Sequence, residues 1–119
     1  MILNRIQKRN NLNTVYRVDK KGPGGAFHTY RIFTNDENAE SLLEVNFQKG
    51  PRNEADSVRG VADEDLLEIV RDRLAAFQRG ALPTRENACA LTHIEVALMW
   101  LNKRKEDRAE RDVLGTYER

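Results

Sequence analysis

The chain has 119 residues, a length that favours one small domain with a large share of its surface exposed. Charged residues make up 33% of the sequence, yet the formal net charge is only +1, so binding to duplex nucleic acid, which needs a basic surface, is disfavoured. One cysteine and two histidines exclude an internal disulfide and supply too few soft ligands for a structural zinc site, so we expect neither a metal nor a cofactor.

The N-terminal segment, residues 1–9, lacks the apolar core of a signal peptide. No later window approaches the ~20 apolar residues that are needed to span a bilayer. We therefore expect a protein that has no membrane partner and resides in the cytoplasm.

Short runs of β-branched and aromatic residues come next in the chain. Residues 14–18 and 26–33 flank a turn-forming segment at 20–25, which predicts an antiparallel hairpin. A third run at 42–47 predicts a further strand, because its apolar residues alternate with polar ones. Three of its side chains therefore share one face: Leu43, Val45 and Phe47.

The turn at 20–25 combines two lysines with three glycines, so it could offer charge and amide groups to a phosphate. It lacks the spacing of a phosphate-binding loop and precedes a strand instead of a helix, which leaves a plain hairpin turn as the alternative. His28 projects from the following strand and is a candidate ligand contact. No nucleophile or paired carboxylate lies at a diagnostic spacing from it, so an enzyme is the weaker interpretation.

Beyond residues 51–60 the apolar period changes from two to about 3.6, which predicts two helices. The first begins at the acidic residues 63–65 and ends at Gly80, and the second opens at 83–84. The first helix has an apolar stripe of Leu67, Val70, Leu74 and Phe77. The second has one of Ala88, Leu91, Ile94, Leu98 and Leu101. Because the connecting turn is short, the helices should be antiparallel neighbours.

These elements predict an α+β fold. A small antiparallel β-sheet at residues 14–48 precedes an antiparallel two-helix hairpin at 62–112. We expect both to belong to a single domain, residues 1–119, which is small enough to gain from oligomerisation.

Two side chains should crowd the tip of the helical hairpin. Phe77 lies in the last turn of the first helix and Asn87 in the first turn of the second. An aromatic ring beside an amide can hold a nucleobase, because the ring stacks on the base and the amide reads its polar edge. The alternative is that Phe77 belongs to the core and Asn87 only starts a helix.

Arg104 and Arg108 lie one helical turn apart and could bind phosphate oxygens, although the alternative is a solvated helix end. Asn87 and Arg104 are 17 residues apart on one helix, hence roughly 25 Å at ~1.5 Å per residue. One protomer cannot apply both to one small ligand. Two hairpins packed antiparallel would bring them together, so a composite pocket at a dimer interface is a hypothesis.

Met99 and Trp100 lie beside the apolar stripe of the second helix. They could supply the apolar surface of such an interface, or they could belong to the core of a single chain. Either use would bury both side chains.

The chain contains several short motifs, most of them in the predicted helices. They are Phe47-Gln48-x-Gly50-Pro51, Glu64-Asp65-Leu66-Leu67, Asp72-Arg73-Leu74, Phe77-Gln78, Arg85-Glu86-Asn87-Ala88 and Ala97-Leu98-x-Trp100-Leu101-x-x-Arg104. Together these motifs resemble one bacteriophage family, the Thoeris anti-defence sponges, which share a helical hairpin with phage sponges that act against CBASS immunity. The resemblance covers roughly residues 13–116 and is most specific in the helices.

The resemblance implies a function without catalysis, in which the protein sequesters nucleotide signals of bacterial immunity. The implied ligands are glyco-cyclic ADP-ribose isomers, and for some members also cyclic di- or trinucleotides at a separate site. Phe77 would then stack on adenine, Asn87 would hydrogen-bond the ligand, and Arg104 would contact its phosphates from the partner protomer. The implied assembly is a homodimer that associates into a hexamer. On its three-fold axes Arg52 is our candidate for the cyclic trinucleotide.

Two other interpretations remain open at this point. The chain could be a small hydrolase of nucleotide signals, or an adaptor whose helical hairpin covers a host protein. The three predict different fates for the nucleotide, which would be kept, cleaved or ignored.

Overall fold

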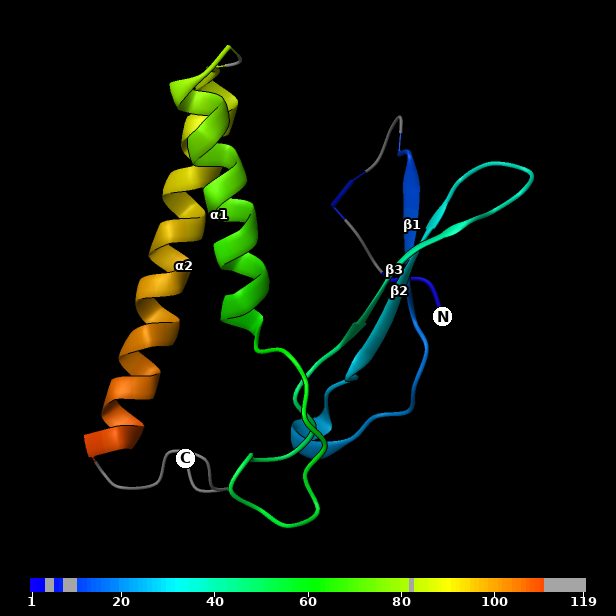
Figure 1. Ribbon diagram of the computed structural model, residues 1–119, viewed down its shortest axis with the longest axis vertical. Coiled ribbons are helices and arrows are strands. Elements are labelled where there is room, and N and C mark those ends of the chain that lie inside the picture. The colour runs from blue at the N-terminus through cyan, green and yellow to red at the C-terminus, as the bar shows by residue number, and fades with distance from the viewer. Residues whose placement is uncertain (4–5, 8–10, 82, 111–119) are drawn as a thin grey trace. The chain divides into compact units, whose positions relative to one another are not determined.

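A computed structural model of the chain describes residues 1–3, 6–7, 11–81 and 83–110 (Figure 1). The chain divides into two compact units, Met1–Val61 and Ala62–Arg119. The first contains three strands that lie side by side, and the second contains two helices. The prediction of an α+β fold is therefore confirmed. That the two units act as a single domain stays a prediction.

The sheet is antiparallel throughout, with strands in the order β1-β2-β3. Their bounds are Asn13–Arg17 for β1, Thr29–Thr34 for β2 and Ser41–Asn46 for β3. β2 begins later than the predicted run at 26–33. The reason is local: the turn before it forms a 3-10 helix, Pro23–Gly25, and the N–H of His28 donates to the carboxylate of Asp19 instead of to a neighbouring strand.

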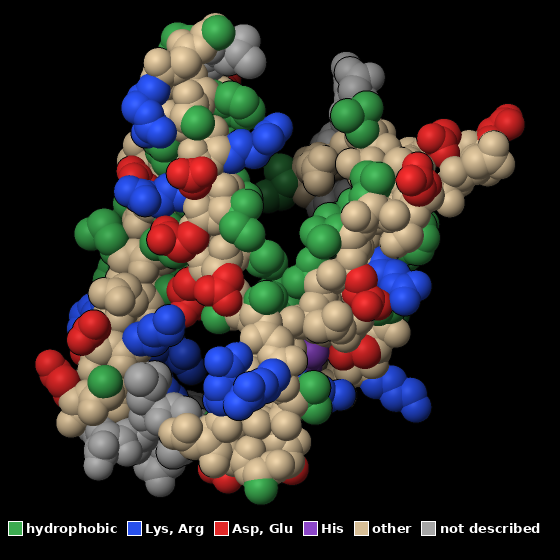
Figure 2. All heavy atoms as spheres, in the orientation of Figure 1, with side chains coloured by type: hydrophobic (Ala, Val, Ile, Leu, Met, Phe, Trp, Pro, Cys, Tyr) green, Lys and Arg blue, Asp and Glu red, His purple; other side chains and the backbone are tan. Residues whose placement is uncertain are grey.

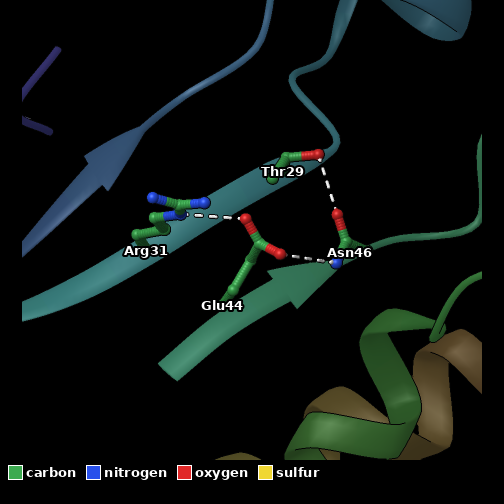
Figure 3. Close-up of polar contacts among 4 residues, drawn as sticks. All are labelled: Thr29, Arg31, Glu44 and Asn46. Atoms are coloured by element: carbon green, nitrogen blue, oxygen red, sulfur yellow. Dashed lines mark hydrogen bonds and ion pairs between the residues drawn. The ribbon is translucent and has the colours of Figure 1, made fainter. Parts of the chain in front are cut away.

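The two faces of the sheet differ in chemistry. On one face Tyr30 pairs with Val45, and its ring meets that of Phe47 edge to face with 5.7 Å between centroids. Leu43 pairs with Ile32 on the same face, which agrees with the predicted alternation. The opposite face carries a row of polar contacts among Thr29, Arg31, Glu44 and Asn46 (Figure 3).

The centre of that polar row is an ion pair between Arg31 Nε and Glu44 Oε1 at 2.9 Å. The hydrogen bond from Arg31 lowers the pKa of Glu44, and a second one from the Asn46 amide acts in the same direction. Asn46 in turn accepts a hydrogen bond from the hydroxyl of Thr29 at 3.1 Å. Cross-strand pairs of this kind support the register of β2 and β3.

The helical unit is a hairpin of α1, Asp63–Arg79, and α2, Arg85–Glu110. Two ion pairs show that the helices are antiparallel, as predicted: Arg71 meets Glu95, whereas Glu64, near the start of α1, meets Lys105, near the end of α2. The predicted acidic residues occupy the first turn of α1, where negative charge suits the helix dipole. In the described part of the chain, no helix has both the length and the apolar content to cross a bilayer.

Burial is incomplete in both units. None of the described apolar side chains is fully buried. The predicted stripe of α2 is half-buried along its length: Ala88, Leu91, Ile94, Leu98 and Leu101. Val70 of the predicted α1 stripe is 42% exposed and departs from it. Exposed apolar side chains lie among mixed charges on the surface (Figure 2).

The core position considered for Met99 and Trp100 is wrong. Met99 is 69% exposed and Trp100 is 67% exposed, and Val96, one turn before Trp100, is 43% exposed. The stripe that packs against α1 is already filled by smaller aliphatic residues of α2, so these side chains fall on the outer face of the helix. We call Val96, Met99 and Trp100 the outer apolar face of α2.

Candidate functional site

The hairpin tip, by which we mean residues 77–81 and 83–87, holds the two side chains predicted to bind a base. Phe77 lies two residues before the end of α1, and Asn87 is the third residue of α2. Both side chains are half-buried. The structure therefore places them at the same end of the hairpin, as helix geometry predicted.

A clamp of hydrogen bonds fixes the two sides of the tip to each other. The Gln78 side chain donates from Nε2 to the carbonyl of Thr84 and accepts at Oε1 from the N–H of Thr84, both at 3.0 Å. The Thr84 hydroxyl then accepts from the N–H of Asn87 at 3.0 Å, which caps the start of α2. Gln78 thus connects the helix turn of Phe77 to that of Asn87.

The side-chain amide of Asn87 has no hydrogen bond to any other described residue. Its main-chain N–H donates to the hydroxyl of Thr84, the cap of α2. An amide offers two donors and one acceptor, so Asn87 has its whole side-chain capacity available to a ligand.

Arg73 is an unexpected neighbour of the tip. Its guanidinium carbon lies 5.0 Å from the centroid of the Phe77 ring, within the range of a cation–π contact. The two residues are one turn apart on α1, and Arg73 is exposed. The sequence interpretation missed this pair, although its i, i+4 spacing was the signal that could have found it.

At the far end of α2 the two candidate arginines differ from each other. Arg104 is exposed, whereas Arg108 is only 8% exposed. The interpretation of both as a solvated helix end is therefore wrong for Arg108. The neighbouring lysines form ion pairs, Lys103 with Asp107 and Lys105 with Glu64, each at 3.0 Å. No ion pair among the described residues involves Arg104, so its charge is available to an anion.

A shallow groove of about 430 Å³ lies along the middle of the hairpin. It is a poor site for a phosphate, because its one arginine, Arg71, is already paired with Glu95 at 2.9 Å and a second glutamate lies in the wall. Its lining consists of Glu68, Arg71, Glu95, Leu98, Asn102 and Met99, and Met99 therefore lies at the border between this groove and the outer apolar face of α2.

His28 lies in the sheet unit and is 8% exposed. Its Nδ1 is a buried atom without a hydrogen-bond partner among the described residues, which is uncommon for a buried polar group. Desolvation raises the pKa of the neighbouring Asp19, but N–H groups of His28 and Thr29 donate to this carboxylate and outweigh it, so the pKa is lowered overall. His28 is therefore held by its main chain and has a side-chain nitrogen unused.

Arg52 closes the loop that follows β3. Its Nε and Nη2 donate to Gln48 Oε1 at 3.1 and 2.9 Å, and Nη2 also donates to the carbonyl of Gly60 at 3.1 Å. Gly60 packs so tightly that a Cβ there would lie 2.4 Å from the Phe47 carbonyl carbon. These contacts could not be predicted from the sequence, since hydrogen bonds from side chains to main-chain groups have no periodic signature.

Comparison with known proteins places this hairpin in a family. The model of the Acb2/Tad1 hairpin domain matches residues 39–106, more than half of the chain. The chain belongs to the Acb2/Tad1 hairpin family. A relative, Thoeris anti-defense 1 of Bacillus phage SBSphiJ7, is 49% identical over 81 residues, which are 68% of this chain and 56% of that protein. The chain thus spans little more than half the length of this relative.

The family match contains most of the candidate residues. Phe77, Asn87, Arg104 and Arg52 lie within residues 39–106. His28 and Arg108 lie outside that range. Membership confirms the resemblance inferred from the motifs, because those motifs are concentrated in the two helices that the family model covers.

Proposed function

We propose that this chain is a sponge of phage anti-defence, which binds glyco-cyclic ADP-ribose signals without cleaving them. Two observations support the proposal: membership of the Acb2/Tad1 hairpin family and the similarity to a protein named for anti-defence against Thoeris. Sequestration has to occur where the signal is made, so the proposal places the protein in the cytoplasm of the host bacterium.

The residues of the hairpin tip supply the groups that this proposal needs. Phe77 supplies a ring for an adenine base, and the uncommitted amide of Asn87 supplies polar recognition. Arg104 has no ion pair among the described residues, but it lies on the same helix at roughly 25 Å from Asn87 by helix rise. We therefore assign Arg104 to the phosphates of a ligand held by the tip of a partner protomer, with Arg108 one turn away.

A homodimer is supported by the outer apolar face of α2. Three large apolar side chains there are between 43% and 69% exposed, and a second copy would remove them from water. Val96 and Trp100 are one helical turn apart, so they form a stripe along which a second α2 could pack antiparallel. Such packing would bring the tip of one hairpin to the Arg104 end of the other.

We propose further that the dimer associates into a hexamer and that Arg52 there contacts cyclic di- or trinucleotides. Arg52 is exposed, and its contacts to Gln48 and Gly60 hold its guanidinium in a fixed position. His28 is proposed as a hydrogen-bonding residue for a ligand, on the strength of its unpartnered Nδ1.

Recovery of the ligand tests the central proposal. The purified protein is mixed with glyco-cyclic ADP-ribose, free ligand is removed, and the complex is denatured by heat. We expect intact ligand in the supernatant. Cleaved nucleotide would show the hydrolase interpretation to be right, and failure to retain the ligand would favour an adaptor that acts on a host protein.

Two substitutions test the composite pocket. Asn87→Ala and Arg104→Ala should each weaken binding by about 10-fold or more, because each removes a hydrogen-bonding group from the ligand. Both variants should keep the oligomer, since neither side chain belongs to the outer apolar face. Binding by calorimetry and mass by ultracentrifugation give the two readouts. Unchanged affinity in both variants would contradict the pocket.

A further inference from the structure

The hairpin tip and the turn of α1 that precedes it carry a net positive charge. Between residues 73 and 87, a stretch that includes both, the sequence has three arginines and one glutamate. Three ion pairs between described residues of the helical unit involve Arg71, Lys103 and Lys105, which all lie away from the tip. A partly desolvated anion at the tip would therefore find cations that are not already neutralised.

Arg73 is the cation whose position the contacts define. Its guanidinium lies over Phe77, and no carboxylate forms an ion pair with it among the described residues. Arg71, two residues earlier and also exposed on the same helix, is in contrast held by Glu95 at 2.9 Å. Of these two arginines on one helix, Arg71 is therefore neutralised by an ion pair, whereas Arg73 has no ion pair among the described residues.

Guanidinium chemistry suits a nucleotide at this place. The group is planar and weakly hydrated, so it can stack on an aromatic ring, and its fork of N–H donors matches phosphate oxygens. A nucleotide presents a base and a phosphate close together. The ring of Phe77 is suited to the base and the guanidinium of Arg73 to the phosphate, and the two residues lie one turn apart on α1.

We propose that Arg73 is a phosphate-binding residue of the hairpin tip. In the chain without ligand its guanidinium covers the ring of Phe77; when the base stacks on that ring, the guanidinium turns to a phosphate of the same nucleotide. Each tip then contributes a cation of its own to the ligand, besides the Arg104 that we assign to the partner protomer. This inference rests on the proposed function.

Calorimetry with glyco-cyclic ADP-ribose at low and high ionic strength tests the proposal. Arg73→Ala should weaken binding by about 10- to 100-fold, the usual effect of losing a hydrogen-bonded charge. The loss should shrink as salt rises, because screening already weakens the contact in the parent protein. Arg73→Lys keeps the charge but loses the fork of N–H donors, so its affinity for the ligand should lie between those of the parent protein and Arg73→Ala.

Arg71→Ala is the matched control, since it removes the same charge from the same helix and should leave the affinity nearly unchanged. If Arg73→Ala and Arg71→Ala lost ligand affinity equally, the effect would come from the net charge of the protein alone, which would overturn the proposal. A loss at Arg73 that does not depend on salt, and that Arg73→Lys does not partly restore, would show that the arginine only braces the Phe77 ring, which also overturns it.

The same experiment separates this inference from the function on which it depends. If the parent protein binds the ligand and Arg73→Ala binds equally well, the sponge stands and the role of Arg73 fails. If the parent protein does not bind, both fail together. A thermal melt of each variant confirms that the helical unit is folded.

Discussion

At the residue scale, Gln78 is important for its position, because its side chain joins the end of α1 to the start of α2. One primary amide donates to and accepts from the main chain of Thr84, and Thr84 caps the helix turn that holds Asn87. Gln78 is therefore a positioning residue for the proposed site. Both polar atoms of its side chain are engaged by the main chain of Thr84, so its contribution to the tip is to hold the two sides together.

Gln78→Glu gives a pH-dependent test of that role. At neutral pH the carboxylate can still accept from the Thr84 N–H but repels the Thr84 carbonyl, so ligand affinity should fall by about 10-fold. A protonated carboxyl is again both donor and acceptor, so the affinity ratio to the parent protein should recover as pH falls towards the ordinary pKa of ~4.3. Calorimetry over this range measures the ratio. A ratio that stays constant with pH would argue against the clamp.

What the sequence could predict at this scale depends on the kind of contact. Helix rise placed Phe77 and Asn87 at one end of the hairpin, because both lie close to helix ends marked by Gly80 and Thr84. The clamp of Gln78 was not predictable, since a side chain that bonds main-chain groups six residues away leaves no pattern. The burial of Arg108 was missed because a charged residue near a helix end is usually solvated.

At the element scale, the loop between β3 and α1 is organised by side-chain contacts. Gln48 accepts at Oε1 from Arg52 and from the N–H of Gly60, and its Nε2 donates to the carbonyl of Gly50. Main-chain bridges from Phe47 to Val61 complete the closure. The sequence predicted only a polar link here, although its glycine, proline and arginine residues are the ones that the closure uses.

Gly60→Ala should destabilise this loop, because the added Cβ would lie 2.4 Å from the Phe47 carbonyl carbon and 2.5 Å from the Asn46 oxygen. The cost should be about 1–3 kcal/mol, as in other overpacked positions. Gly25→Ala is the control: it has open space but a φ of +77°, so it reports backbone strain alone, about 1–2 kcal/mol. Urea unfolding measures both, and a Gly60 variant as stable as the parent would contradict the tight packing.

The helices illustrate why apolar periodicity predicts where a helix lies better than it predicts which side chains are buried. Apolar spacing predicted both helices, the short turn between them predicted their antiparallel arrangement, and the inner stripe of α2 is half-buried as expected. Apolar spacing failed for Val70, which is exposed, and it could not decide between a core and an interface position for Met99 and Trp100, which are also exposed in the single chain. A large apolar residue next to a stripe is read as core, yet it can equally face a second molecule.

At the scale of the whole molecule, the outer apolar face of α2 should determine the oligomer. Trp100→Glu places a charge where we propose that a second copy packs, so the dimer should dissociate. Ligand binding should fall with it, because the composite pocket needs Arg104 of the partner. Val58→Glu is the matched control, since Val58 is 58% exposed and lies in the sheet unit. Ultracentrifugation measures the mass, and a Trp100 variant that stays dimeric would contradict the interface.

The lack of a buried apolar side chain in the described residues has a thermodynamic consequence. A chain that keeps several large apolar side chains exposed when alone, and half-buries the others, gains folding free energy when self-association removes them from water. By mass action, the melting temperature should then rise with total protein concentration, and a ligand held across two protomers should raise it most in dilute solution. Assembly, folding and capture of the signal would be one linked equilibrium, in which the amount of protein made in the infected cell sets how firmly each signal molecule is held.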